Sequence, residues 1–258
     1  MDQPSAAKGH AMPDFLPDVP VDAVLAALAR SPGNELASGK FDSPESSAAL
    51  AVNAFGRFLD APALLPALPA VPMSRPEQVA LSVEMHFPWR GGRHPWCDVA
   101  LTSATSFVGI CARRYEPFRP AKANRFAEPF DSLDWGEGMA RFEALRAALT
   151  RGALTYRHLD AVQLVKLAYG LRTQAHKRAR GAVLVYLHAA PATWASGKPV
   201  DPASIARHGA EVEDLARRIK GQDVAFVPLR WSDLLAQWAA TPALAPHAKA
   251  LQTRFGPF

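Results

Sequence analysis

A change in the spacing of apolar residues near residue 77 constrains the fold of this chain more than any other feature. In residues 79–87 every second side chain is large and apolar, which predicts a β-strand with one apolar and one polar face. The turn residues 90–93 lead to predicted strands over residues 97–102 and 106–114. The block 77–115 is therefore expected to form a three-strand meander.

Helical patterns and one buried strand follow the meander. Residues 138–150 and 158–177 have the periodicity of helices that bury one side. Residues 182–187 are almost continuously apolar between turn signals, which predicts a central strand buried on both faces. A helix over 202–220, a strand over 223–229 and a helix over 231–240 complete the pattern. This order predicts an α/β fold with a mixed sheet flanked by helices.

The N-terminal part of the chain is predicted to be an arm. Residues 1–19 are rich in proline and contain few large apolar side chains, so they are expected to be frayed. Helices are expected over residues 21–29 and 46–59. Since no interior linker is visible, we predict a helical and flexible arm over residues 1–32 and a single domain over residues 33–258.

Several classes of protein are excluded by composition. The most apolar run, residues 61–73, contains four prolines and cannot form a membrane-spanning helix. Two cysteines are too few for a disulfide scaffold, and the N-terminus lacks the pattern of a secretion signal. We therefore expect a reduced, cytoplasmic protein with no membrane partner.

The positive charge of the chain is concentrated in two windows. The whole sequence has 29 Lys and Arg against 24 Asp and Glu, a net charge of +5, although residues 1–80 are net acidic. Residues 81–125 hold seven cations against three acids, and residues 151–180 hold seven cations against one acid. Because basic surfaces attract phosphate backbones, this pattern predicts a nucleic acid as partner.

Four phrases of the sequence carry a family resemblance. They are residues 33–36 (GNEL), 39–41 (GKF), 46–53 (SSAALAVN) and 84–119. On these phrases the chain resembles the restriction-endonuclease-like, or PD-(D/E)XK, nuclease superfamily, and more narrowly a bacterial group of restriction-endonuclease-like proteins. The resemblance covers most of residues 33–240. It implies a core of one helix, a three-strand meander, a second helix and a further strand.

The resemblance also implies a metal site. In the superfamily, an acid on the second strand and the acid of an acid-x-Lys triplet on the third strand hold a divalent cation, and the lysine orients or activates water. Asp98 matches the first acid, whereas the triplet position reads Cys111, Ala112 and Arg113. Mg²⁺ prefers carboxylates to a thiol, so the implied site has lost one acid.

One hypothesis is a DNA nuclease that uses Mg²⁺ or Mn²⁺ with substitutes for the lost groups. Glu84, on the polar side of the neighbouring strand, would join Asp98 as a metal ligand. Arg113 would stabilise charge on the phosphate, because a guanidinium cannot act as a base. Lys166 would replace the triplet lysine, since its spacing from Gln163 resembles a helix motif of some relatives.

Two further hypotheses assign no cleavage to this site. In one, the chain is a catalytically impaired, nucleic-acid-binding module, and Arg113 either contacts phosphate or forms a salt bridge with Glu84 or Asp98. In the other, a structural zinc ion is bound by a cluster of acceptable ligands, namely His86, His94, Cys97 and Cys111. The spacing of these four residues matches no compact zinc pattern.

Both nucleic-acid hypotheses assign contacts to side chains of the two basic windows. These residues are Arg90, Arg93, Arg114, Arg119, Gln163, Arg172 and Arg178. Arginine is suited to this task because its planar fork of donors matches the geometry of a phosphate. DNA is the expected partner, and a homodimer is expected because nucleases that cut both strands commonly act in pairs.

Overall fold

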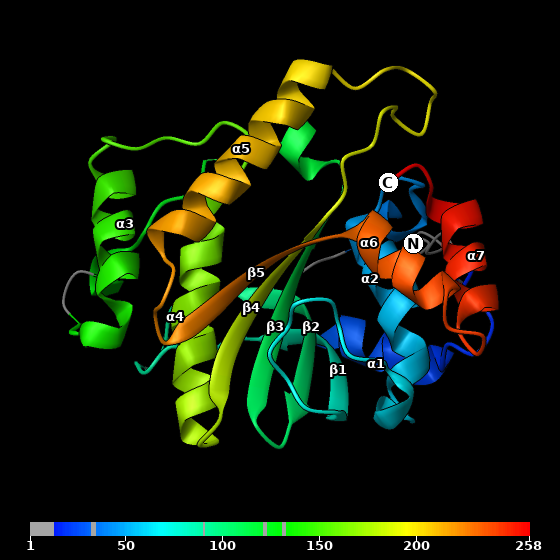
Figure 1. Cartoon of the computed structure of the whole chain (residues 1–258), viewed down its shortest axis with the longest axis horizontal. Helices are drawn as coiled ribbons and strands as arrows, with labels where there is room; N and C mark the ends of the chain where they lie inside the picture. Colours follow the sequence, from blue (N-terminus) through cyan, green and yellow to red (C-terminus); the bar gives the residue numbers. More distant parts are fainter. Residues whose placement is uncertain (1–12, 32–34, 90, 121–122, 131–132) are drawn as a thin grey trace, which may run out of the picture.

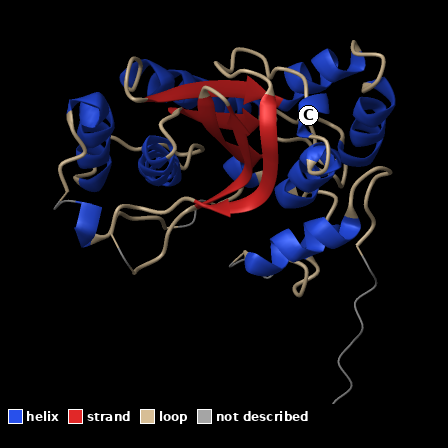
Figure 2. Cartoon of the chain, turned by 90° about the horizontal axis from the view of Figure 1, so that it is seen from below, coloured by secondary structure: helices blue, strands red, loops and turns tan. Residues whose placement is uncertain are grey.

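A computed structural model describes residues 13–31, 35–89, 91–120, 123–130 and 133–258 of the chain. Within these residues a five-stranded sheet lies between two groups of helices (Figures 1 and 2). The strands are β1 (Pro76–Glu84), β2 (Trp96–Ser103), β3 (Ser106–Arg113), β4 (Gly181–His188) and β5 (Val224–Arg230). The helices are α1 (Val21–Arg30), α2 (Ser47–Phe55), α3 (Ala140–Thr150), α4 (Ala161–Lys177), α5 (Pro202–Arg218), α6 (Trp231–Ala239) and α7 (Ala245–Phe255).

The strands follow one another across the sheet in chain order, β1-β2-β3-β4-β5. β1, β2 and β3 are antiparallel neighbours, whereas β4 is parallel to β3 and β5 is parallel to β4. Every residue of β4 after Gly181 is buried, in agreement with its continuous apolar sequence. The predicted α/β class, the three-strand meander and the mixed sheet flanked by helices are thus confirmed.

The sheet separates two hydrophobic cores. The first core lies between the sheet and helices α1, α2, α6 and α7, and it contains Val185 and Leu187 of β4. The second core lies between the sheet and helices α3, α4 and α5, and it contains Leu184 and Tyr186 of β4. In Figure 1 the helices of the two cores lie on opposite sides of the strands. None of the described helices is long and apolar enough to cross a membrane.

A glycine allows α4 to pack closely against the sheet side of the second core. A Cβ atom at Gly170 would overlap the backbone carbonyl of Met85. Glycine in the middle of a helix lowers stability by about 0.5–1 kcal/mol relative to alanine. The close packing that Gly170 allows outweighs this low helix propensity. The position of α4 matters for the site because its N-terminus lines the pocket described below.

The described part of the predicted N-terminal arm is packed against the body of the protein. Helix α1 buries Val24 and Leu28 in the first core, next to β1. Before this helix, Val19 is also buried, and the Leu16 N–H donates to Oδ1 of Asn53 at 2.7 Å. The expectation of a frayed segment is therefore wrong for residues 13–19. The predicted boundary between residues 32 and 33, like residues 1–12, lies outside the described residues.

The alternation of side chains between the two faces of β1 is interrupted at Ser82. Val79 and Leu81 are in the first core, whereas Val83 packs against the second core, to which Met85 and Phe87 belong. Ser82 has a left-handed backbone, with φ of 51°, which turns the following residues by one face. The prediction that residues 79, 81, 83, 85 and 87 share one apolar face is therefore wrong beyond Leu81.

In β2, the strand paired with β1, the alternation of side chains between the two faces of the sheet is interrupted at the same place. Cys97 of β2 is in the second core and Val99 is in the first core, so the alternation is interrupted at Asp98. The pairs Leu81↔Val99 and Val83↔Cys97 flank the two irregular residues. Asp98 thus occupies a point where the regular geometry of the sheet breaks, as β-strand irregularities next to functional sites often do.

Candidate functional site

Asp98 lies at the fork where β2 and β3 separate. The β2–β3 pairing ends at Val99↔Ile110, although β3 continues beside β4 as far as Arg113↔His188. Oδ2 of Asp98 accepts a hydrogen bond from the Ala112 N–H at 2.7 Å and another from Nη1 of Arg113 at 3.2 Å. The carboxylate therefore takes the place of the next backbone partner in the ladder and holds Arg113 beside it. The salt bridge between Arg113 and Asp98, one of the sequence alternatives, is present.

The fork opens into a pocket with a volume of about 760 Å³. Its walls come from the N-terminus of α2, the ends of β2, β3 and β4, the segment after β3 and the start of α4. Among the described residues, the lining cations are Lys40, Arg113, Arg119 and Arg157, and the lining acids are Glu35, Glu45, Asp98, Glu116 and Asp160. The pocket is thus nearly balanced in charge, so the cations of the two basic windows do not make it strongly positive.

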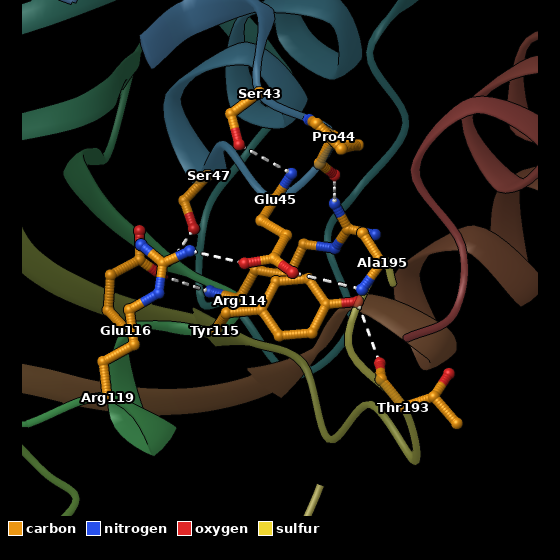
Figure 3. Close-up of polar contacts among 10 residues, drawn as sticks. All are labelled: Ser43, Pro44, Glu45, Ser47, Arg114, Tyr115, Glu116, Arg119, Thr193 and Ala195. Carbon is orange, nitrogen blue, oxygen red and sulfur yellow. Dashed lines mark hydrogen bonds and ion pairs between the residues drawn. The ribbon is translucent and has the colours of Figure 1, made fainter. Parts of the chain in front are cut away.

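Two of these acids hold the wall of the pocket together (Figure 3). Oε2 of Glu116 accepts hydrogen bonds from the Ser47 hydroxyl at 2.7 Å and from the Arg114 N–H at 2.9 Å. Glu45 forms an ion pair with Arg119 at 2.6 Å and accepts the Ala195 N–H at 3.1 Å. These contacts join the N-terminus of α2, the segment after β3 and the loop after β4, so both carboxylates stabilise the wall of the pocket.

Asp160 has a structural role as a helix cap, whereas the surroundings of Glu35 raise its pKa. Asp160 caps α4, because its Oδ1 accepts the Gln163 N–H at 2.9 Å. For Glu35, burial is the main cause that raises the pKa, and the carboxylates of Asp98 and Glu116 raise it further. Sequence reasoning assigned no role to Glu35, although this residue belongs to one of the matching phrases; a carboxyl with a raised pKa in a pocket is a candidate functional group.

The triplet position offers no carboxylate to the pocket. The Cys111 side chain is buried in the second core, and burial raises the pKa of its thiol to about 12. The thiol is therefore neutral at neutral pH and is a poor ligand for a hard cation. Burial also raises the pKa of the Asp98 carboxyl, an effect that Arg113 and the Ala112 N–H only partly offset.

A group of buried polar rings lies behind Cys111. Tyr186 of β4 is its partner across the sheet, and the Tyr186 hydroxyl is hydrogen-bonded to Nε2 of His208 at 2.9 Å. The ring of His188 stacks on Tyr186, and Nδ1 of His188 has no hydrogen-bond partner among the described residues. Burial lowers the pKa of His188 to about 4 and that of His208 to about 3. These residues lie on segments far from the predicted triplet, so the sequence pattern gives no signal for them.

The other predicted catalytic residues do not join Asp98. Glu84 lines a different pocket, beside Arg30, and its Oε2 lies 3.4 Å from Nε2 of His86. Lys166 donates a hydrogen bond to Oδ1 of Asn124 at 2.7 Å, and burial lowers the pKa of its amine. Gln163 lines the pocket, at the start of α4. The metal pair Asp98 and Glu84 is therefore not assembled, and the roles of Lys166 and Gln163 stay predictions.

The arginines predicted to bind nucleic acid are dispersed. Arg119 lines the pocket, and Arg93 is exposed in the loop between β1 and β2, whereas Arg90 lies outside the described residues. Arg172 forms an ion pair with Asp223 at 3.2 Å, and the guanidinium of Arg178 lies 4.5 Å from the ring centre of Phe107. Arg114 is 0% exposed and packs over Tyr115, so the prediction that it contacts nucleic acid is wrong.

The donor sets expected for metals do not fit this geometry. Among the described residues, no three or more His, Cys, Asp or Glu side chains are grouped so that they could hold a metal ion. His86 and His94 are close, with ring centres 4.9 Å apart, but the buried Cys97 thiol donates to the Val99 carbonyl instead. The zinc hypothesis is therefore not retained. For Mg²⁺, Asp98 is engaged by Arg113 and Ala112, and the triplet position carries the Cys111 thiol where the resemblance implies a second carboxylate.

The fold and the site together define an α/β protein with a mixed five-stranded sheet and a polar pocket at the fork between β2 and β3. Comparisons of the chain with protein-family models, with curated proteins and with solved structures give no match. Its function is therefore argued from the site itself.

Proposed function

We propose that this chain is a nucleic-acid-binding protein with a restriction-endonuclease-like core that has lost metal-dependent cleavage. The observation that carries the proposal is the ion pair between Arg113 and Asp98, 3.2 Å long, in the pocket where the resemblance implies a metal ion. Arg113 places a permanent positive charge where the cation would be, and it removes Asp98 from metal coordination. The order of α2, β1, β2, β3, α4 and β4 supports the resemblance, since it is the order that the family core implies.

Binding would depend on cations of the pocket that can reach a phosphate. Lys40 and Arg157 are exposed at the pocket, and the Arg113 side chain is 25% exposed beside Asp98. Four of the five lining acids accept hydrogen bonds from backbone N–H groups, namely Glu45, Asp98, Glu116 and Asp160. Because these bonds partly compensate the negative charge, the acids oppose a phosphate less than free carboxylates would.

A direct test combines a binding assay and a cleavage assay on the same protein. Fluorescence anisotropy with labelled DNA in EDTA should show binding that weakens steeply as salt rises. Lys40→Ala should lower the affinity, whereas Lys249→Ala, an exposed lysine on α7 away from the pocket, should not. Incubation of the same DNA with Mg²⁺ or Mn²⁺ should give no cleavage. Failure to bind DNA or RNA at low salt would refute the proposal.

One observation favours the alternative of an active nuclease. Glu35, Asp98 and Glu116 all line the pocket, and the carboxylates of Asp98 and Glu116 raise the pKa of Glu35, although the described residues do not group them as metal ligands. A cation could gather them only if Arg113 left Asp98. Metal-dependent cleavage that Asp98→Ala abolishes and Lys249→Ala preserves would establish this alternative and exclude the loss of cleavage.

A further inference from the structure

The dimensions of the pocket bear on which form of nucleic acid it can admit. Pockets of about 300–1,000 Å³ enclose molecules of the size of a cofactor or drug, and this pocket, at about 760 Å³, falls in that range. The major groove of a DNA duplex is by itself about 12 Å wide, so a whole duplex is too broad to enter. A phosphate can reach Arg113 at the fork only if the chain that carries it is narrow enough to enter the pocket.

A partly exposed tryptophan lies beside the pocket wall. The ring of Trp194 stacks on Tyr115, with ring centres 5.1 Å apart and planes 17° apart. Tyr115 is fixed in turn, because its hydroxyl donates to the Thr193 carbonyl at 3.0 Å. The next residue, Ala195, is bonded to the pocket residue Glu45 (Figure 3). The indole is therefore already held in one orientation, so the stacking of a ligand on it costs little side-chain conformational entropy.

The turn that carries Trp194 also brings positive charge to this place. The Trp194 N–H donates to the Lys198 carbonyl at 2.8 Å, and the Gly197 N–H donates to the Trp194 carbonyl at 2.9 Å. Gly197 has φ of 82°, a conformation that suits glycine in a tight turn. The Lys198 side chain is exposed, and the guanidinium of Arg119 lies 6.0 Å from the ring centre of Trp194. An aromatic ring flanked by cations is the combination that binds single strands by stacking and charge.

We propose that the pocket admits unpaired nucleotides of a single strand, with Trp194 as the residue on which a base stacks beside the entrance. This inference rests on the proposed nucleic-acid binding and narrows it to single-stranded chains and single-stranded extensions of duplexes. Arg113 then contacts a phosphate inside the pocket, Arg119 contacts the backbone at the pocket wall, and Lys198 contacts it outside the pocket. Trp194 is a specificity-determining residue in this account, because stacking requires an unpaired base.

Three labelled DNA probes separate the outcomes. They are a single strand of mixed sequence without self-complementarity, a blunt duplex of the same sequence, and that duplex with a single-stranded extension. Anisotropy titrations of the full chain, in EDTA and at one fixed salt concentration, should give affinities at least about tenfold higher for the first and third probes than for the blunt duplex. Removal of a stacked base typically costs 1–3 kcal/mol, which is about a 5- to 150-fold change.

A tryptophan pair tests the role of the indole. Trp194→Ala should weaken single-strand binding at least about fivefold and leave duplex binding unchanged, while Trp194→Phe should retain most of the affinity. Trp89→Ala is the matched control, since Trp89 is also half-buried and stacks on an aromatic ring, that of Phe87, with centres 4.5 Å apart. A change in stability alone would lower binding of all probes together, so the ratio of affinities distinguishes stacking from a loss of fold.

The outcomes are distinct for this inference and for the function on which it rests. Equal affinity for the single strand and the blunt duplex overturns the inference and leaves nucleic-acid binding standing. The same holds if Trp194→Ala lowers both affinities by the same factor. Absence of binding to all three probes overturns both.

Discussion

The two faces of the central sheet carry different residues at the same strand ends. Toward the first core, the ends of β3 and β4 present Ala112 and Leu187, which are fully buried and apolar. Toward the second core, the same ends present a thiol, a guanidinium, a phenol and an imidazole, namely Cys111, Arg113, Tyr186 and His188. Four helices cover the first face, and the pocket opens on the second.

This difference indicates that the two faces are shaped by different requirements. An apolar core needs only close packing, and replacement of buried ionic groups by apolar residues is often neutral or stabilising. The polar strand ends therefore make the protein no more stable than apolar residues at the same positions would. Departures from local consistency are expected at functional sites, so the polar corner is where the function of this chain is best sought.

The largest expected effect lies on the apolar face. Phe55 is fully buried and its ring contacts Trp231 and Trp238, with centres 6.3 and 5.7 Å apart. Phe55→Ala should lower the free energy of unfolding by about 3–5 kcal/mol, as measured by urea denaturation, because it leaves a cavity. The DNA affinity of the folded fraction should not change. The half-buried Phe118, near His208 on the other face, is the control, and its replacement by Ala should lower the free energy of unfolding by less.

The next effect concerns the ion pair of the fork. Asp98→Ala should lower the free energy of unfolding by about 2–3 kcal/mol, since it leaves the Ala112 N–H without an acceptor and removes the carboxylate that pairs with the partly buried Arg113 guanidinium. Asp98→Asn should cost less, because the amide oxygen can still accept the Ala112 N–H. Chemical denaturation of both variants measures the difference. Greater stability of Asp98→Ala than of the wild type would contradict the structural role given to Asp98.

A third effect follows from the buried histidines. Their pKa values in the folded chain, about 4 for His188 and about 3 for His208, are below the ordinary value near 6.5. Between pH 6.5 and 4.5 the unfolded chain binds protons that the folded chain does not, so stability is present above pH 6.5 and is lost as pH falls. Each histidine contributes a loss of about 2 kcal/mol over this window.

A variant isolates one of the two histidines. His208→Gln can keep a hydrogen bond to Tyr186 and cannot titrate, so its free energy of unfolding should fall about 2 kcal/mol less between pH 6.5 and 4.5 than that of the wild type. Around the ring, His188 and His158 also disfavour the charged form. Urea denaturation at the two pH values gives the slope, and an unchanged slope in His208→Gln would show that His208 does not titrate as the structure implies.

The smallest expected effect is at the surface. Arg119→Ala should change the free energy of unfolding by no more than about 1 kcal/mol, because exposed ion pairs contribute little. It should, however, lower DNA affinity and reduce the slope of log affinity against log salt by about 1. Arg217→Ala is matched to it, since Arg217 also forms an exposed ion pair, with Asp214. Equal salt slopes for the two variants would remove Arg119 from the binding surface.

The sequence predicts the sheet better than it predicts the site. The period-two block and the apolar run of β4 depend on local spacing, and the strands formed as expected. The face on which Glu84 lies depends on the left-handed backbone at Ser82, which a side-chain pattern does not reveal. Helix α7, which begins at Ala245, was not predicted because its apolar residues are few and its core position is set by α2 and α6.

The spacing of residues along the chain also does not predict which residues line the pocket. Glu35, Glu45 and Tyr186 come from segments far apart in the sequence, and only the tertiary fold brings them to Asp98. The burial of Arg114, next to the partly exposed Arg113, depends on surrounding aromatic rings that include Phe255 near the far end of the chain. A count of cations along the chain cannot distinguish these two arginines.

The proposed function implies that Arg113 and Cys111 have replaced a metal site at Asp98. Calorimetric titration with Mn²⁺ tests it most directly, on the wild type, on the double variant Cys111→Glu with Arg113→Lys, and on each of these combined with Asp98→Ala. We expect no saturable binding by the wild type, and binding by the double variant that Asp98→Ala removes. Saturable binding by the wild type that disappears in Asp98→Ala would contradict the claim.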